Sequence, residues 1–425
     1  MLSVSKKNSA SVVAEKLLRA TVNMLVFSTL ARSLGPEMLG MFSLTQAVFL
    51  VGYPIALAVN EQVLLKYLLV GARPYRKLRL SALKLKYLSS VTIYSVAITF
   101  SYFYFDEKLF KVAAIYCLIY FVNVEVIYFS KRRSEQKSHE VLKIIAMVLL
   151  PFGIFKMVVS IIFQDLIAVA AIYFLEAAIL AAMAYTTSGT RTESHDTADA
   201  IGIVKLSELY KDAWPIAISA VLISIYLRVD QFMIDAMLNR VELGYYSTAV
   251  KISEAVTSIV TAYLISTYPA LLRLRKSSIE AYEKAVVLLL RRYLVMSVVL
   301  TLLVYFFGEH LIIVMFGPEY RAASDVLTIH VAGSMFVYYG IVCTQWLVAE
   351  GLTIYRFYRT LAGVLLNIGL NIILIPKMGI IGAAIATVLV HLFSSILFNA
   401  FSHKTHPIFY LQIRSIIRGD PHKTT

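Results

Sequence analysis

Apolar runs of about 20 residues recur along the whole chain, and they constrain the fold more than any other feature of the sequence. A helix needs about 20 residues to cross the roughly 30 Å of hydrocarbon in a bilayer. Backbone groups inside hydrocarbon must be bonded internally, so runs of this length indicate helices rather than a barrel. With 59% hydrophobic and 16% charged residues, the chain of 425 residues is too apolar for a soluble globular protein. The sequence therefore predicts an all-α integral membrane protein.

About twelve transmembrane helices are expected. Their ranges are 12–34, 39–60, 86–105, 109–130, 142–163, 165–187, 212–236, 245–268, 287–307, 325–349, 356–376 and 378–401. Lys and Arg are frequent in the loops after the second, fourth, eighth and tenth helices, where Lys86, Arg132 and Arg133 are among them, and in the C-terminal tail. The alternate loops are short and contain few basic residues, so the positive-inside rule places both termini in the cytoplasm. Basic loops on an anionic leaflet explain the formal net charge of +14, and no binding of nucleic acid is expected.

A polar segment of mixed charge divides the chain. We expect residues 188–211 to be a cytoplasmic linker between an N-terminal lobe, residues 1–187, and a C-terminal lobe, residues 212–401. Each lobe would contain six helices. Residues 402–425 are expected to form a cytoplasmic tail.

A short internal repeat links the two lobes. The segment LGPEMLGMFS, which begins at Leu34, matches LNRVELGYYS, which begins at Leu238, at a single offset of 204 residues. An even number of predicted helices separates the copies, so both run in the same direction. This predicts parallel lobes related by an axis along the membrane normal, with substrate bound in a central cavity between them.

Ionisable residues inside the predicted spans are the candidates for function, because each costs about 2.5–3.5 kcal/mol to insert into hydrocarbon. In the span 212–236, Arg228 and Asp235 belong to one polar stripe, while Asp230 projects elsewhere. Lys251 lies at a similar depth on the next, antiparallel helix, so the two cations could share one anion. Glu254 follows Lys251 by one helical turn and could hold it when the site is empty.

A second polar stripe lies on the first helix, where Glu15, Arg19 and Asn23 follow each other at intervals of four residues. The remaining polar candidates inside spans or at their ends are Glu61, Glu125, Lys156, Glu176, Asn367, Asn371 and His391. Paired charges that only hold helices in register are the alternative for any one of them.

For the set as a whole we favour a polar cavity with a cationic bias, suited to phosphate or an acidic sugar. The proposed substrate-binding cations are Arg19, Lys156, Arg228 and Lys251. The other cavity candidates are Glu61, Glu125, Glu176, Asp230, Asp235, Glu254, Asn367 and Asn371. Single carboxylates such as Glu61, Glu125 or Asp230 could bind a coupling proton or sodium ion.

Several kinds of chemistry have no motif in this sequence. Cys117 and Cys343 lie one in each half inside apolar segments, which is typical of core residues rather than a disulfide or a metal pair. No P-loop or HExxH motif is present, and no external loop is long enough to hold a catalytic domain. We therefore expect no cofactor, no metal and no enzymatic activity.

Four motifs together resemble one family of transporters. The stretch from Arg228 to Glu254 is similar to the pattern R-x-D, M-I, L-G-x-Y-S-x-A, I-x-E of bacterial polysaccharide exporters. LARSLGPEMLGMFSL from Leu30, FGPEY from Phe316 and PKMGIIGAAIATVLVH from Pro376 look like signatures of the same family, in the same order. The chain thus resembles the Wzx-type flippases of O-antigen and capsule, within the superfamily of multidrug, oligosaccharidyl-lipid and polysaccharide exporters.

This resemblance implies two six-helix lobes around a cavity that opens alternately to the two sides of the bacterial inner membrane. The implied cargo is an oligosaccharide on undecaprenyl diphosphate, moved from the cytoplasmic to the periplasmic leaflet, with a polysaccharide polymerase as a candidate partner. The cations Arg19, Lys156, Arg228 and Lys251 would meet the diphosphate or acidic sugars. The chain departs from the family pattern at NEQVLLKYL, where Lys66 is the nearest basic residue and is assigned no role.

Two other functions stay open at this point. An ion-coupled multidrug exporter of the same superfamily would need an acidic cavity for cationic drugs. A membrane polymerase or glycosyltransferase would need a large external loop or an acidic catalytic motif.

Overall fold

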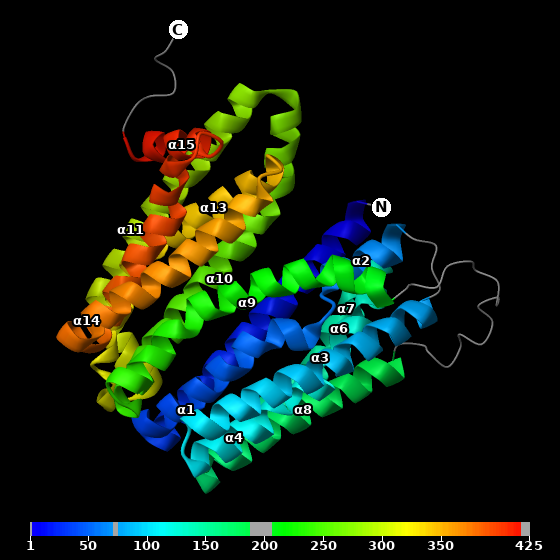
Figure 1. Cartoon of the computed structure of the whole chain (residues 1–425), viewed down its shortest axis with the longest axis vertical. Helices are drawn as coiled ribbons and strands as arrows, with labels where there is room; N and C mark the ends of the chain where they lie inside the picture. Colours follow the sequence, from blue (N-terminus) through cyan, green and yellow to red (C-terminus); the bar gives the residue numbers. More distant parts are fainter. Residues whose placement is uncertain (1, 71–74, 188–205, 418–425) are drawn as a thin grey trace. The chain divides into compact units, whose positions relative to one another are not determined.

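The computed structural model describes residues 2–70, 75–187 and 206–417, and helices account for nearly all of these residues (Figure 1). The described residues contain no strand. The chain divides into two compact units, Met1–Ile225 and Tyr226–Thr425. The boundary falls inside α9 (Leu206–Met237), and residues 206–211 of the expected linker belong to this helix. Residues 188–205 of the expected linker lie outside the described residues.

The described residues of unit 1 form eight helices and the first part of α9. They are α1 (Leu2–Leu57), α2 (Glu61–Val70), α3 (Tyr75–Tyr104), α4 (Glu107–Cys117), α5 (Ile119–Val122), α6 (Glu125–Ser134), α7 (Ser138–Phe163) and α8 (Leu166–Thr187). Gly35 (φ 77°, ψ 173°) breaks α1 into two helices at the position where we expected a turn between spans. Positive φ costs glycine little, and Pro36 then fits the first turn of the new helix because it needs no backbone N–H there.

Unit 2 contains the rest of α9 and the C-terminal elements. These are α10 (Arg240–Ser277), α11 (Ile279–Phe316), η2 (Pro318–Tyr320), α12 (Ala323–Ala332), α13 (Ser334–Ala349), α14 (Thr353–Ser395), η3 (Leu397–Phe401) and α15 (His406–Ile416). Gly379 (φ 59°) breaks α14 in the same way that Gly35 breaks α1. The expected tail is partly ordered, because α15 packs Ile408 and Leu411 into an apolar cluster with α11 and α13.

The surface has the character of a membrane protein. Seven segments of the described chain are long and apolar enough to cross a bilayer, or eight if the bent pair α12–α13 is one span. The long helices α1 and α14 each contain a break and can each supply two crossings, while α3 and α10 are less apolar than the others. Each of the twelve expected spans overlaps a helix, a broken helix or a run of short helices of the described chain, although several of these helices extend eight to eleven residues beyond the expected ends.

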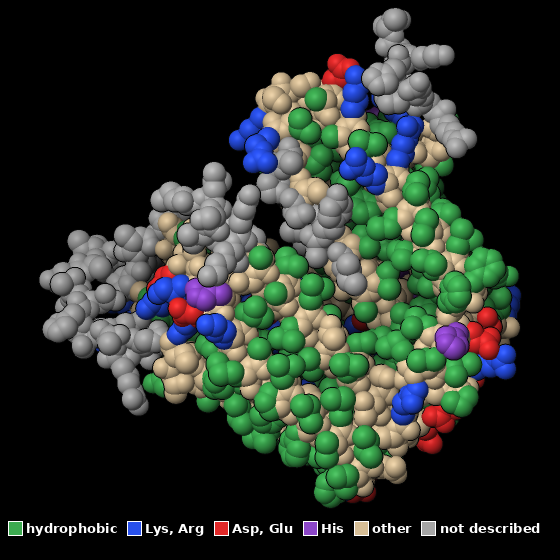
Figure 2. Space-filling view, turned by 180° about the vertical axis from the view of Figure 1, so that it is seen from behind, with side chains coloured by type: hydrophobic (Ala, Val, Ile, Leu, Met, Phe, Trp, Pro, Cys, Tyr) green, Lys and Arg blue, Asp and Glu red, His purple; other side chains and the backbone are tan. Residues whose placement is uncertain are grey.

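Hydrophobic side chains are widespread on the face seen in Figure 2, and few charged side chains lie among them. Ile162 and Phe163 at the end of α7 are each 66% exposed, and Phe306 on α11 is 71% exposed. A soluble monomer rarely exposes apolar surface of this extent, so these faces are suited to contact lipid.

The two copies of the repeat have equivalent local structures within their own units. One copy starts a helix directly after Gly35 and the other directly after its N-cap residue, Asn239. Four pairs of matched positions are buried in both copies: Leu39 and Leu243, Gly40 and Gly244, Phe42 and Tyr246, Ser43 and Ser247.

Candidate functional site

In unit 1, a network of two arginines and two glutamates joins α1, α2 and α6. Arg19 Nε lies 3.3 Å from Glu15 Oε1, one helical turn away on α1. The other Glu15 oxygen accepts from Arg133 Nη2 at 2.7 Å, and Arg133 Nη1 donates to Glu61 Oε2 at 2.5 Å. Arg133 is 17% exposed and Glu15 9%, so the centre of this network is largely removed from solvent, while Arg19 and Glu61 are about one-third exposed. It brings together the predicted candidates Arg19 and Glu61 through an arginine that we had expected in a loop.

Glu125, at the start of α6, lies beside this network. With its amide nitrogen turned toward the carboxylate, Asn123 donates to both oxygens of Glu125 and accepts from the Tyr53 hydroxyl at 3.0 Å. Glu125 also interacts electrostatically with Arg19 and Lys86. This buried carboxylate therefore has both hydrogen-bond donors and cations around it, which offsets the cost of burying it.

A separate ion pair lies between α7 and α8, where Lys156 contacts Glu176. The Lys156 side chain is 1% exposed, and its Nζ lies 3.7 Å from the centroid of the Tyr173 ring. Tyr173 contacts the rings of Phe42 and Tyr116 at centroid distances of 5.6 and 5.4 Å. Lys156 is thus held by one carboxylate and one aromatic face, an arrangement that stabilises a buried cation.

In unit 2, the predicted pair of cations shares one carboxylate. Arg228 Nη2 on α9 lies 2.9 Å from Glu254 Oε1 on α10. Lys251, one turn before Glu254, interacts electrostatically with both Arg228 and Glu254. The three candidates are therefore neighbours. The Glu254 carboxylate occupies the position in which Arg228 and Lys251 could together bind an anion.

Asp230 belongs to a different, more deeply buried group. It is 4% exposed and accepts hydrogen bonds from the Tyr246 hydroxyl and, at 2.9 Å, from the backbone N–H of Gln231. The Tyr246 hydroxyl also lies 3.5 Å from the Thr387 hydroxyl, and its ring makes an edge contact with His330. Asp230 therefore makes its hydrogen bonds within this group, although it also interacts electrostatically with Arg228.

The asparagine candidates are buried on α14. Asn371 donates to Asn367, one turn earlier, and both are at most 1% exposed. Near the other end of α14, His391 Nδ1 lies 2.6 Å from the Tyr226 hydroxyl, which also approaches Ser394 at 3.4 Å. In both groups the polar side chains therefore contact one another within unit 2.

Two other positions lie apart from these groups. Asp235, near the end of α9, lies 3.8 Å from Arg240 at the start of α10. Lys66 on α2 forms an ion pair with Asp212 on α9 at 2.8 Å, within unit 1. Both members of the Lys66 pair are substantially exposed, so this contact adds little to stability.

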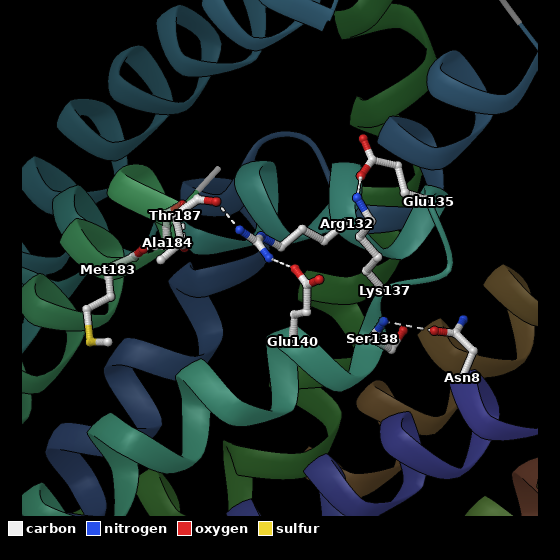
Figure 3. Close-up of polar contacts among 9 residues, drawn as sticks. All are labelled: Asn8, Arg132, Glu135, Lys137, Ser138, Glu140, Met183, Ala184 and Thr187. Atoms are coloured by element: carbon white, nitrogen blue, oxygen red, sulfur yellow. Dashed lines mark hydrogen bonds and ion pairs between the residues drawn. The ribbon is translucent and has the colours of Figure 1, made fainter. Parts of the chain in front are cut away.

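Three basic residues that we expected in loops are instead held inside unit 1, which corrects that assignment. Lys86 is buried in α3, and Arg133 joins the network described above. Arg132 donates to Glu140 on α7 and to the carbonyl of Thr187 at the end of α8 (Figure 3). These basic residues lie at the ends of apolar runs. Hydropathy alone therefore placed the three residues in loops between the helices.

Among the described residues, no group of three or more His, Cys, Asp or Glu side chains is close enough to hold a metal ion. Cys117 and Cys343 are buried free thiols. The candidate residues supply paired cations and carboxylates in each unit, and such groups can bind charged ligands.

Comparison with known proteins connects this geometry to a family. The model of a family described as polysaccharide biosynthesis protein matches residues 5–275. No curated protein matches the chain.

Solved structures share the fold at low identity. An inward-facing multidrug resistance MATE family transporter of the MOP superfamily superposes with a TM-score of 0.70 at 12% identity, covering 94% of this chain and 96% of that one. Lipid II flippase MurJ in an inward closed conformation gives 0.69 at 15% identity, covering 96% and 90%. The Vibrio cholerae MATE transporter VcmN gives 0.61 at 12% identity, covering 97% and 98%.

Proposed function

Because the chain belongs to the polysaccharide biosynthesis protein family, we propose that it is a flippase for a lipid-linked oligosaccharide. Its cargo would be an O-antigen or capsule repeat unit on undecaprenyl diphosphate, moved by alternating access from the cytoplasmic to the periplasmic leaflet of the bacterial inner membrane. The observation that carries this proposal is the family match over residues 5–275, which contains all four proposed binding cations. The cations are Arg19, Lys156, Arg228 and Lys251.

The ion pairs suggest how a diphosphate would be bound. An arginine can donate two parallel hydrogen bonds to a phosphate, as it does to a carboxylate. In unit 2, Arg228 and Lys251 both interact with Glu254, so a diphosphate would take the place of this one carboxylate. The cost of separating Arg228 from Glu254 would be offset by two cations acting on the two charged phosphates. When no cargo is bound, the glutamate then offsets one of the two positive charges.

A flippase needs a source of energy for net transport. We propose that a carboxylate among Glu61, Glu125 and Asp230 takes up a coupling proton or sodium ion, and that removal of the product by a polymerase supplies further drive. Glu61 is already paired with Arg133, whereas Glu125 and Asp230 are held mainly by neutral donors. A carboxylate that is held mainly by neutral donors is better suited to exchange a proton than one that is paired with an arginine, so Glu125 and Asp230 are the stronger candidates.

A deletion strain tests this function. The biosynthetic enzymes are left intact, and the leaflet that carries the undecaprenyl-linked oligosaccharide is determined with a membrane-impermeant glycan probe. Accumulation on the cytoplasmic face, together with loss of surface polysaccharide, supports the flippase. If the oligosaccharide still reaches the periplasmic face, the protein is not its essential flippase.

A multidrug exporter is the second candidate, because MATE transporters share the fold. Such a protein would have to bind cationic drugs, yet Arg19, Lys156 and Arg228 place positive charges beside the candidate carboxylates. Drug susceptibility of the same deletion strain separates the two functions. Increased sensitivity to cationic drugs with normal surface polysaccharide would favour the exporter.

A further inference from the structure

Lys86 is among the largest fully buried side chains of the described chain, at 1% exposure. Its Nζ donates to the carbonyl oxygens of Ala56 at 3.0 Å and Tyr120 at 2.7 Å. Ser90, one helical turn later on α3, donates to the same two carbonyls, at 2.7 Å to Tyr120 and 3.4 Å to Ala56. Two backbone oxygens from distant segments therefore share one ammonium and one hydroxyl.

Both carbonyls belong to the ends of helices. Ala56 lies in the last turn of α1, and the chain leaves this helix through Ala58, whose φ is 56°. Tyr120 lies in the last turn of the run α4–α5, which continues through the helical residue Leu118 and ends before Asn123. The last four carbonyls of a helix have no partner within it and carry partial negative charge. Lys86 thus supplies a positive charge where two helices end.

The neighbouring residues hold these two helix ends in place. Tyr120 stacks on Phe49 of α1 at a centroid distance of 4.9 Å and 14° between the rings. Its hydroxyl donates to the Phe49 carbonyl at 2.8 Å. Gly52 allows this approach, because a Cβ there would overlap the Tyr120 hydroxyl. Glu125, just beyond the break, interacts electrostatically with Lys86 and is the nearby opposite charge. The oxygens are therefore fixed by packing and not only by the lysine itself.

Carbonyls at the C-terminal ends of broken helices form the kind of site that binds a free sodium ion in ion-coupled transporters. A lysine ammonium is a compact point charge that can occupy such a site. We propose that Lys86 is a tethered cation in a monovalent cation site formed by the carbonyls of Ala56 and Tyr120 and the hydroxyl of Ser90. Shortening Lys86 to alanine vacates the site for a small free cation. This inference does not depend on the identity of the cargo.

The tethered cation has a consequence for the wild-type chain. Because the ammonium is covalently attached, these helix ends stay joined without a free ion. The stability of the wild-type protein is therefore expected to be the same in sodium, potassium and ammonium salts. The Lys86→Ala variant instead acquires a requirement for a small cation.

Thermal unfolding of the purified full chain in detergent tests this site. Wild type and Lys86→Ala are compared at equal ionic strength in chlorides of sodium, potassium, ammonium and N-methyl-D-glucamine, the last being too large for the site. We expect Lys86→Ala to unfold several degrees below wild type in N-methyl-D-glucamine, and one small cation to restore most of this loss with saturating dependence on concentration. Lys84→Ala is the matched control, because Lys84 lies on the same helix with an exposed side chain, and its unfolding temperature should not depend on the cation.

Lys86→Met separates charge from volume, because methionine fills the space without a charge. This variant is expected to unfold below wild type in every salt, with no recovery. The proposal is overturned if Lys86→Ala or Lys86→Met is as stable as wild type, or if no small cation raises the unfolding temperature of Lys86→Ala. Should Lys86→Ala fold only when a small cation is present during extraction, the proposal is supported; failure to fold in all four salts contradicts it.

Discussion

Arg228 Nη2 on α9 lies 2.9 Å from Glu254 Oε1 on α10, and Lys251 interacts electrostatically with both. The arginine side chain is 15% exposed and the glutamate side chain 36%, so the ion pair is only partly buried. A partly exposed ion pair is weak enough to exchange one anion for another. This relationship is the basis of our account of diphosphate binding.

Replacing Arg228 by alanine should abolish most glycan export. The lost charge-assisted hydrogen bonds are worth about 2 kcal/mol or more, which corresponds to a decrease of more than about tenfold in cargo binding. Arg228→Lys should keep part of the activity, because it retains the charge but not the planar fork. Surface polysaccharide is measured in the deletion strain at matched protein levels, with Arg240→Ala as a control at the start of α10. Full export by Arg228→Ala would exclude a role for this cation.

Replacing Glu254 by glutamine should strengthen the binding of undecaprenyl diphosphate. The change removes the anion that competes with the diphosphate for Arg228 and Lys251. We expect the dissociation constant to fall by about two- to fivefold, since a partly exposed ion pair is worth up to about 1 kcal/mol. Binding to the purified protein is measured by titration. A weaker affinity in Glu254→Gln would mean that the glutamate positions the cations for the cargo instead of competing with it.

The Lys156–Glu176 pair should respond to mutation as a buried ion pair. Removing one partner leaves the other charge buried without compensation, which costs about 3–5 kcal/mol. Glu176→Gln and Lys156→Met should therefore each lower the unfolding temperature in detergent. The double variant should lose less stability than the sum of the losses in the two single variants, because it leaves no unpaired charge buried. Strict additivity of the two effects would show that the residues do not interact.

Two glycines on α14 provide a matched test of the break in that helix. A Cβ at Gly382 would overlap the backbone carbonyl of Leu374, which cannot move like a side chain. Gly382→Ala should therefore destabilise the protein by about 1–3 kcal/mol. Gly369 has no atom within 4 Å of the added Cβ, so Gly369→Ala should be neutral or stabilising by up to about 1 kcal/mol. Equal unfolding temperatures for the two variants would contradict this packing.

The helices of this protein could be predicted from sequence because the signal is strong and local. Long apolar runs predicted that the helices exist, and Gly35 lies between two expected spans. Gly379 breaks α14 at the second residue of the expected span 378–401, two residues beyond the expected separation at 377. The ends of the helices were less predictable. The helix α3 starts at Tyr75, eleven residues before the expected span 86–105, because basic residues can continue a helix beyond the hydrocarbon.

The partners of the candidate residues could be predicted only where they lie on one helix or on adjacent helices. The closeness of Arg228, Lys251 and Glu254 followed from helical spacing and depth. The contact of Arg133 with Glu15 joins residues 118 positions apart, and no periodicity in either segment points to the other. Lys86 was missed for the same reason, since its acceptors are backbone atoms that carry no sequence signal.

Reconstitution of the purified protein into liposomes tests the central claim most directly. Undecaprenyl-diphosphate-linked oligosaccharide is incorporated into both leaflets, and the fraction accessible to a membrane-impermeant glycan-modifying enzyme outside is followed over time. Our account predicts that wild-type protein brings nearly all of the oligosaccharide within reach of the enzyme, whereas Arg228→Ala leaves the inner-leaflet fraction protected, as in liposomes without protein. A protected fraction that persists with folded wild-type protein, even under an imposed proton or sodium gradient, would contradict the assignment as a flippase.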